Sequence, residues 1–64
     1  MILLTKLNGE SVVINSRQIE FIEVIPESKI NMMNGKYHIV KESVEEIIAK
    51  EVEFNHKILE KLKA

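Results

Sequence analysis

Two Asn-Gly dipeptides constrain the fold more than any other feature of this sequence. Each separates two short runs of apolar and β-branched residues, and the dipeptides are Asn8-Gly9 and Asn34-Gly35. Asn-Gly supplies the two consecutive positive-φ residues of a type I′ turn, so each dipeptide predicts a two-residue β-hairpin. Such turns also set the register, which pairs Thr5 with Val12 and Ile30 with Ile39. We therefore expect two hairpins, over residues 2–15 and 29–41.

A third apolar run, over residues 19–25, predicts a further strand that ends at the turn formed by Pro26. In this strand Ile19 and Phe21 are expected to face one way and Ile22 the other. The sequence thus predicts an α+β fold, in which a small antiparallel five-stranded β-sheet precedes one long C-terminal α-helix. Apolar side chains lie on both faces of the predicted sheet, so a single helix cannot cover them all.

The last third of the chain carries the start signal and the periodicity of an amphipathic helix. Ser43 and Glu46 match a capping box, in which the serine hydroxyl accepts from an exposed amide and the glutamate reaches back. An apolar stripe at helical spacing follows, from Val44 to Leu62. We therefore expect a helix over about residues 43–62.

The predicted helix is longer than the sheet on which it packs. About twenty helical residues span about 30 Å, whereas strands of about six residues span about 20 Å. The overhang continues an apolar seam at coiled-coil spacing, with an asparagine at a core position. Together with the two-faced sheet, this seam predicts a homo-oligomer. Its interface is expected to contain Val52, Asn55, Ile58, Leu59 and Leu62. The alternative is a monomer whose helix frays at its end.

The small size of the chain also favours self-association. With 64 residues it is expected to form one domain, over residues 1–64, with its strands within 2–41. A chain this short buries only about 60% of its unfolded surface, and small folds usually add disulfides, a metal or a partner. The sequence contains no cysteine, which excludes disulfides and thiolate metal sites. Association with a second copy of the chain is the remaining way to add stability.

Charge and hydropathy set the expected surroundings of the protein. Nine basic and ten acidic residues give a net charge of −1, so no nucleic-acid partner and no anionic membrane surface are expected. No apolar run reaches the roughly 20 residues that a spanning helix needs, and residues 1–6 lack the pattern of a signal peptide. We expect a cytoplasmic protein that is not inserted in a membrane.

Side chains suited to catalysis are few. Cys, Asp and Trp are absent, and each serine is explained by a turn, a strand or a helix cap. Nucleophilic catalysis needs a base held near the nucleophile, and nothing in the pattern places one. His56 and Glu60 have a spacing that suits a metal ion on a helix, but a third ligand is missing. We predict no enzyme activity, no catalytic residue, no cofactor and no metal ion.

Two strand residues are the best candidates for contact with a partner protein. Lys6 and His38 occupy strand positions that the predicted registers do not assign to the core. We expect these side chains to form a partner surface. The alternative is that they are edge-strand charges that discourage aggregation between sheets.

Several short segments occur in a specific order along the chain. They are Leu4-Thr5-Lys6-Leu7-Asn8-Gly9, Ile19-Glu20-Phe21-Ile22-Glu23 with Pro26, Asn34-Gly35-Lys36, and Val40-Lys41-Glu42-Ser43-Val44-Glu45-Glu46. This ordered set covers roughly residues 2–48 and resembles the flagellar FlbD family, which includes swarming motility proteins. The resemblance implies a small cytoplasmic protein that supports motility, through the torque of the flagellar motor and at its cytoplasmic face. It implies no catalytic residue.

A second resemblance gives an alternative function. Residues 1–14 are also similar to the start of the carbon storage regulator family, whose members are short dimeric β proteins that bind mRNA. RNA recognition of that kind needs a basic stripe and a base-contacting arginine. This chain has a single arginine, Arg17, in an expected loop. The flagellar role is therefore the leading prediction, and RNA-binding regulation is the alternative.

Overall fold

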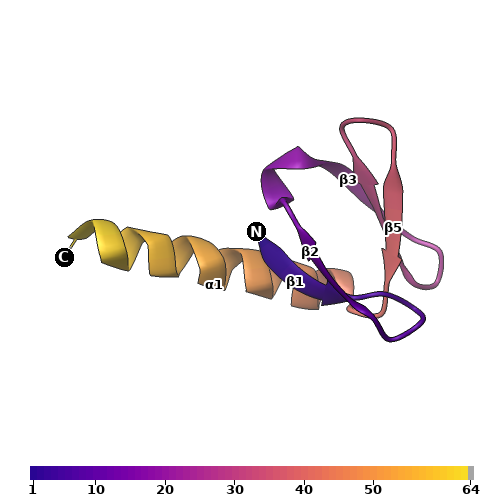
Figure 1. Cartoon of the computed structure of the whole chain (residues 1–64), viewed down its shortest axis with the longest axis horizontal. Helices are drawn as coiled ribbons and strands as arrows, with labels where there is room; N and C mark the ends of the chain where they lie inside the picture. Colours follow the sequence, from indigo (N-terminus) through magenta and orange to yellow (C-terminus); the bar gives the residue numbers. More distant parts are fainter. Residues whose placement is uncertain (64) are drawn as a thin grey trace.

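The structure is a computed structural model that describes the backbone of residues 1–63 and the side chains of residues 1–57. Five strands precede one long helix, and a short 3-10 turn lies between the second and third strands (Figure 1). In chain order the elements are β1 Ile2–Thr5, β2 Ser11–Ile14, η1 Ser16–Gln18, β3 Ile19–Val24, β4 Ser28–Met32, β5 Tyr37–Val40 and α1 Val44–Lys63.

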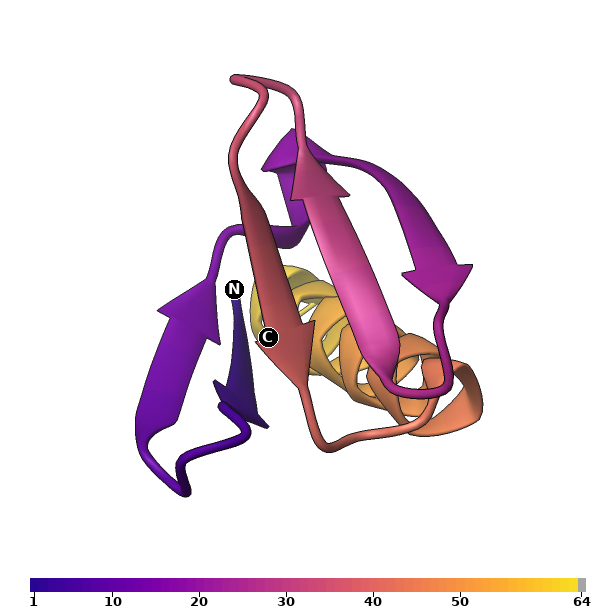
Figure 2. The same ribbon diagram turned by 90° about the vertical axis from the view of Figure 1, so that its right-hand side faces the viewer.

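The strands form two antiparallel sheets, so the prediction of one five-stranded sheet is wrong. The first sheet pairs β1 with β2, and the second has the order β3-β4-β5 (Figure 2). A single bridge, between Lys6 and Val40, joins the two sheets. Next to it the Lys41 N–H donates to the Thr5 carbonyl, with an N···O distance of 2.8 Å. After Lys6 the chain enters the β1–β2 turn and leaves β5, so the two sheets pair no further.

Both Asn-Gly segments form a turn of three residues, one more than predicted. At the first, the Gly9 N–H donates to the Lys6 carbonyl at 2.9 Å and the Lys6 N–H donates to the Glu10 carbonyl at 2.8 Å. Among the described residues only the two glycines have positive φ, +91° at Gly9 and +86° at Gly35. A type I′ turn needs two such residues, so the turn is the three-residue type with glycine alone in the left-handed region. The predicted type I′ turns are therefore wrong.

The asparagine side chains account for this choice of turn. The Asn8 Oδ1 accepts from the Glu10 N–H at 2.9 Å, and the Asn34 Oδ1 accepts from the Lys36 N–H at 3.0 Å. Each asparagine thus bonds to the backbone two residues further on, as asparagine often does in turns. This bond keeps the asparagine in ordinary backbone geometry and leaves the left-handed position to the glycine.

The turn type shifts each register by one residue and reverses the faces of the strands. Thr5 lies opposite Ser11 rather than Val12, and Ile30 lies opposite His38 rather than Ile39. A shift of one residue moves every side chain to the other face of its strand. The predicted pairs are therefore wrong, and His38 shares the inner face of the sheet with the fully buried Ile30.

A bulge in β3 corrects a further prediction. The register of β3 on β4 shifts between Ile19 and Phe21, so the alternation of side chains is interrupted there. As a result Ile19 and Ile22 both pack against the core, whereas Phe21 is exposed. The prediction that Ile19 and Phe21 face the same way is wrong.

The core lies between the sheets and the first turns of the helix. Its buried members come from four strands and α1, and they are Ile2, Leu4, Ile14, Ile30, Val40 and Ile47. The predicted helix and its capping box are confirmed. The Glu46 N–H donates to the Ser43 Oγ at 3.1 Å, and the Glu46 carboxylate accepts from the Ser43 N–H at 3.4 Å. This cap satisfies backbone donors that a helix start otherwise leaves free.

The helix continues beyond the strands, as its length predicts. Figure 1 shows α1 leaving the strands and extending along the long axis of the molecule, whose extents are 40 × 23 × 19 Å. No helix in the described chain combines the length and the apolar content that crossing a membrane requires.

Candidate functional site

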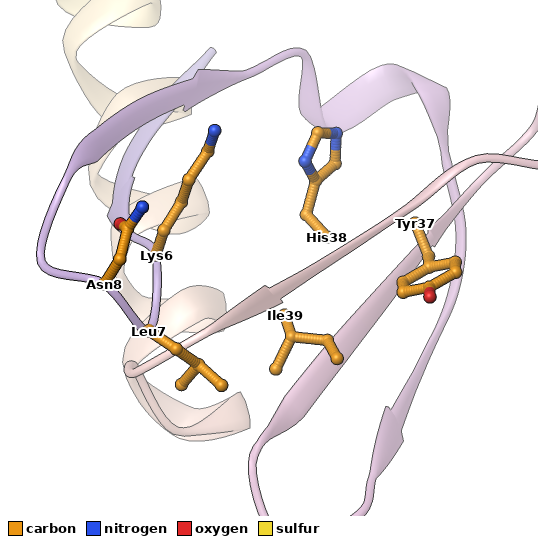
Figure 3. Close-up of a pocket in the computed structure, with 6 residues that line it drawn as sticks. All are labelled: Lys6, Leu7, Asn8, Tyr37, His38 and Ile39. Atoms are coloured by element: carbon orange, nitrogen blue, oxygen red, sulfur yellow. The ribbon is translucent and has the colours of Figure 1, made fainter.

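A pocket of about 400 Å³ lies where the β1–β2 turn separates from β5 (Figure 3). We call it the β5-edge pocket. Its lining residues come from two segments that are far apart in the sequence, and they are Lys6, Leu7, Asn8, Tyr37, His38 and Ile39. The pocket exists because β1 pairs with β5 at one bridge only and then turns away. It is thus a gap at the open edge of the three-stranded sheet.

The two walls of this pocket differ in chemistry. Figure 3 shows the side chains of Lys6 and His38 on one side of β5, and those of Leu7 and Ile39 on the other. Strand alternation explains the division, because His38 and Ile39 are consecutive residues. Tyr37 lies on the same side as Ile39, and its ring carries the Lys29 Nζ at 4.5 Å from the ring centroid. One wall is therefore basic and the other is mainly apolar.

The backbone of β5 points unpaired groups into this gap. The Met32 N–H donates to the Lys36 carbonyl on the β4 side, and the Lys41 N–H donates to the Thr5 carbonyl on the β1 side. Because backbone groups alternate in direction along a strand, those of the odd-numbered residues point toward β1. β1 pairs no further along β5 than Val40. The backbone groups of Tyr37 therefore face the pocket without a partner strand.

No acidic side chain of residues 1–57 forms an ion pair with the basic wall. Within the described part of the chain, neither Lys6 nor His38 has a side-chain hydrogen bond or an ion pair. The nearby Glu10 carboxylate instead accepts from the Asn8 amide at 2.9 Å. The Lys6 ammonium is therefore not committed to an ion pair within the described residues.

A second acid, Glu42, is committed to the link between the sheets. Its carboxylate accepts from the Thr5 N–H and from the Thr5 hydroxyl, each at 2.9 Å. Partial burial opposes the ionised form, but these hydrogen bonds and the positive charge of Lys50 outweigh it, so the pKa of Glu42 is lowered below the ordinary 4.5. Glu42 thus holds β1 against the segment that leads into α1.

The structure brings the two predicted partner residues together. Lys6 and His38 are 32 positions apart in the sequence (38 − 6) and line the same pocket. Sequence reasoning missed Leu7, Tyr37 and Ile39, the apolar wall. The signal that could have placed them was the three-residue turn, because that register puts His38, and not Ile39, on the face of the buried Ile30.

The predicted interface on α1 is described in part. Val52 and Asn55 are exposed, and Val52 is 62% accessible. The side chains of Ile58, Leu59 and Leu62 lie outside the described residues. An apolar groove of about 290 Å³ runs between the helix and β3, and its lining includes Ile19, Ile22, Ile47, Ile48 and Val52. We call the exposed residues Ile48, Val52 and Asn55 the helix stripe.

Comparison with known proteins identifies the family of the chain. No curated protein and no solved structure matched it. The FlbD family, described as flagellar and swarming motility proteins, matches residues 1–59. That match includes all five strands and most of α1, together with both segments that line the β5-edge pocket. The chain therefore belongs to the FlbD family of flagellar and swarming motility proteins.

Proposed function

We propose that this protein is a non-enzymatic accessory of the flagellum that supports motility by binding other proteins. The family match over residues 1–59 carries the link to motility. In a SwrD-like role, it acts in the cytoplasm, at the cytoplasmic face of the motor, and raises motor torque during swarming. The β5-edge pocket supports a binding role, because it offers unpaired backbone and a lysine, Lys6, that has no ion pair among the described residues. No observation favours the RNA-binding alternative, since Arg17 lies in η1 and not in the pocket that contains Lys6.

Deletion of the gene is the direct test of this function. The deletion strain is expected to lose swarming on a surface while it still assembles flagella, because a torque deficit appears first under high load. Filament counts and the rotation speed of tethered cells measure the two properties separately. Expression of the wild-type chain in the deletion strain should restore both swarming and torque. A deletion strain that swarms normally, at wild-type torque, would remove the assignment.

The helix stripe supports a second part of the proposal, self-association. Ile48 and Val52 are 55% and 62% exposed, although they border the apolar groove between α1 and β3. Exposed apolar residues grouped beside such a groove are typical of protein interfaces. We assign the surface to a second copy of the chain because the small core leaves the monomer with little stability of its own.

The change Val52→Glu should weaken this assembly, because the interface would then bury an uncompensated charge. Light scattering at micromolar concentration is expected to give a mass of at least two 7.4 kDa chains for the wild type and one chain for the variant. Ala49→Glu is the matched control, since it adds the same charge at an exposed α1 residue outside the groove. A wild-type protein that is monomeric at this concentration would contradict self-association.

A further inference from the structure

We infer that the β5-edge pocket takes up an extended acidic segment of a partner protein, which adds to β5 as a further strand. The inference rests on the proposed binding function and names the chemistry of the partner. Three observations carry it: the unpaired backbone of β5, the two-sided lining of the pocket, and the absence of an ion pair at Lys6 among the described residues.

The backbone provides the first part of the recognition. An extended segment placed beside β5 can bond to the Tyr37 N–H and carbonyl, which point into the gap. Addition of a strand to an open sheet edge is a common mode of peptide recognition, in which backbone hydrogen bonds provide affinity. The β1–β2 turn closes one end of the gap, at the bridge between Lys6 and Val40. The bound segment therefore starts where β1 leaves the sheet.

The walls of the pocket provide selectivity. Successive side chains of an added strand point to opposite faces, so one set meets Lys6 and His38 and the other meets Leu7 and Ile39. Carboxylates suit the first wall because the Lys6 ammonium has no ion pair with an acid of the described chain. Apolar side chains suit the second wall. The partner segment is thus an alternation of acidic and apolar residues.

A second copy of this chain fits the same edge poorly. Two β5 strands paired antiparallel about a two-fold axis would have their basic faces on the same side of the joined sheet. That arrangement would place the Lys6 ammonium groups of the two copies on one face, and like charges on facing strands are destabilising. The same charges that attract an acidic segment therefore disfavour self-pairing at this edge, as edge lysines commonly do.

The test is a titration of the full-length ¹⁵N-labelled protein, followed by NMR. The probe is a seven-residue peptide of alternating Val and Glu with blocked ends. We expect amide shifts centred on Tyr37 and Ile39, and slower hydrogen exchange at the Tyr37 N–H. A peptide with Lys in place of Glu should bind weaker by a factor on the order of ten or more. N-methylation of the amides that face β5 should abolish binding.

Charge variants of the protein test the basic wall. Lys6→Glu should weaken binding of the Glu peptide by a factor on the order of ten and strengthen binding of the Lys peptide. Lys57→Glu is the control, because it makes the same charge change on an exposed α1 residue outside the pocket. If Lys6→Glu fails to fold, Lys6→Gln removes the charge alone and should weaken the Glu peptide without strengthening the Lys peptide.

Three results would overturn the inference. They are equal binding of the two peptides, shifts centred on the helix stripe, and changes at residues 37–39 that depend on protein concentration without peptide. Absence of binding at millimolar peptide counts against it in the same way. None of these results bears on the swarming of a deletion strain, so failure of this inference is distinguishable from failure of the proposed function.

Discussion

Replacement of Ile47 by alanine is expected to destabilise the domain by about 2–5 kcal/mol, as buried Ile→Ala changes do. Ile47 is 3% exposed and is the only α1 residue among the buried members of the described core. A domain of 64 residues has a total stability of about 3–10 kcal/mol. The change therefore removes a large part of the free energy of unfolding, and much of the protein should be unfolded at 37 °C. Denaturant titration followed by circular dichroism measures the loss.

The next residue provides a matched control. Ile48 has the same side chain in the same helix but is 55% exposed. Because both changes alter helix propensity equally, the difference between Ile47→Ala and Ile48→Ala isolates burial. Ile48→Ala should change the stability of the monomer by at most about 0.5 kcal/mol. Any larger loss should appear only at protein concentrations at which the helix stripe is covered by a second copy. Equal losses in dilute solution would contradict the position of α1 on the core.

Replacement of Glu42 by glutamine is the second large change, with an expected loss of about 1.5–3 kcal/mol at neutral pH. The Glu42 carboxylate accepts two hydrogen bonds from Thr5 and links β1 to the start of the helix segment. Glutamine retains one oxygen acceptor but loses the charge that strengthens both bonds. Glu20→Gln, on an exposed residue of β3, controls for the loss of one negative charge. A loss as large in the control would show that net charge, and not this link, is responsible.

The same variant has a defined pH signature. The folded-state pKa of Glu42 lies below the ordinary 4.5, so the unfolded chain takes up a proton first as the pH falls. The contribution of Glu42 is therefore complete well above pH 4.5 and is lost as the pH falls through the folded-state pKa. The difference in stability between wild type and Glu42→Gln should be largest at neutral pH and shrink in acid. A difference that stays constant down to pH 3 would show that the carboxylate charge contributes nothing.

Local signals in the sequence predicted the elements better than their pairing. The capping box at Ser43 and Glu46 involves neighbouring residues, and the structure contains it as predicted. An Asn-Gly dipeptide, in contrast, is compatible with a two-residue and a three-residue turn. The hydrogen bond from the Lys36 N–H to the Asn34 side chain favours the second, and the one-residue shift moves His38 to the inner face. A small local preference thus determined which side chains are buried.

The candidate site depends on contacts that no local pattern contains. Lys6 and His38 could be selected from the sequence because the predicted registers did not commit these strand positions to the core. Their proximity depends on the single bridge at Val40, and the apolar wall at Leu7 and Ile39 follows from the same approach. A continuous sheet in which β1 paired along the whole of β5 would have closed this edge and removed the pocket. The break between the sheets was therefore the decisive feature, and only the tertiary arrangement reveals it.

The link between Thr5 and Glu42 joins residues that are 37 positions apart. During synthesis it can therefore form only after residue 42 has left the ribosome. The β1–β2 hairpin leaves the ribosome before Glu42 and Ile47 do. A two-stranded hairpin alone is at best marginally stable in water. The inner residues of the hairpin, Ile2 and Leu4, therefore remain uncovered until the β5–α1 segment has emerged. The β1–β2 hairpin is thus made before the segment that stabilises it.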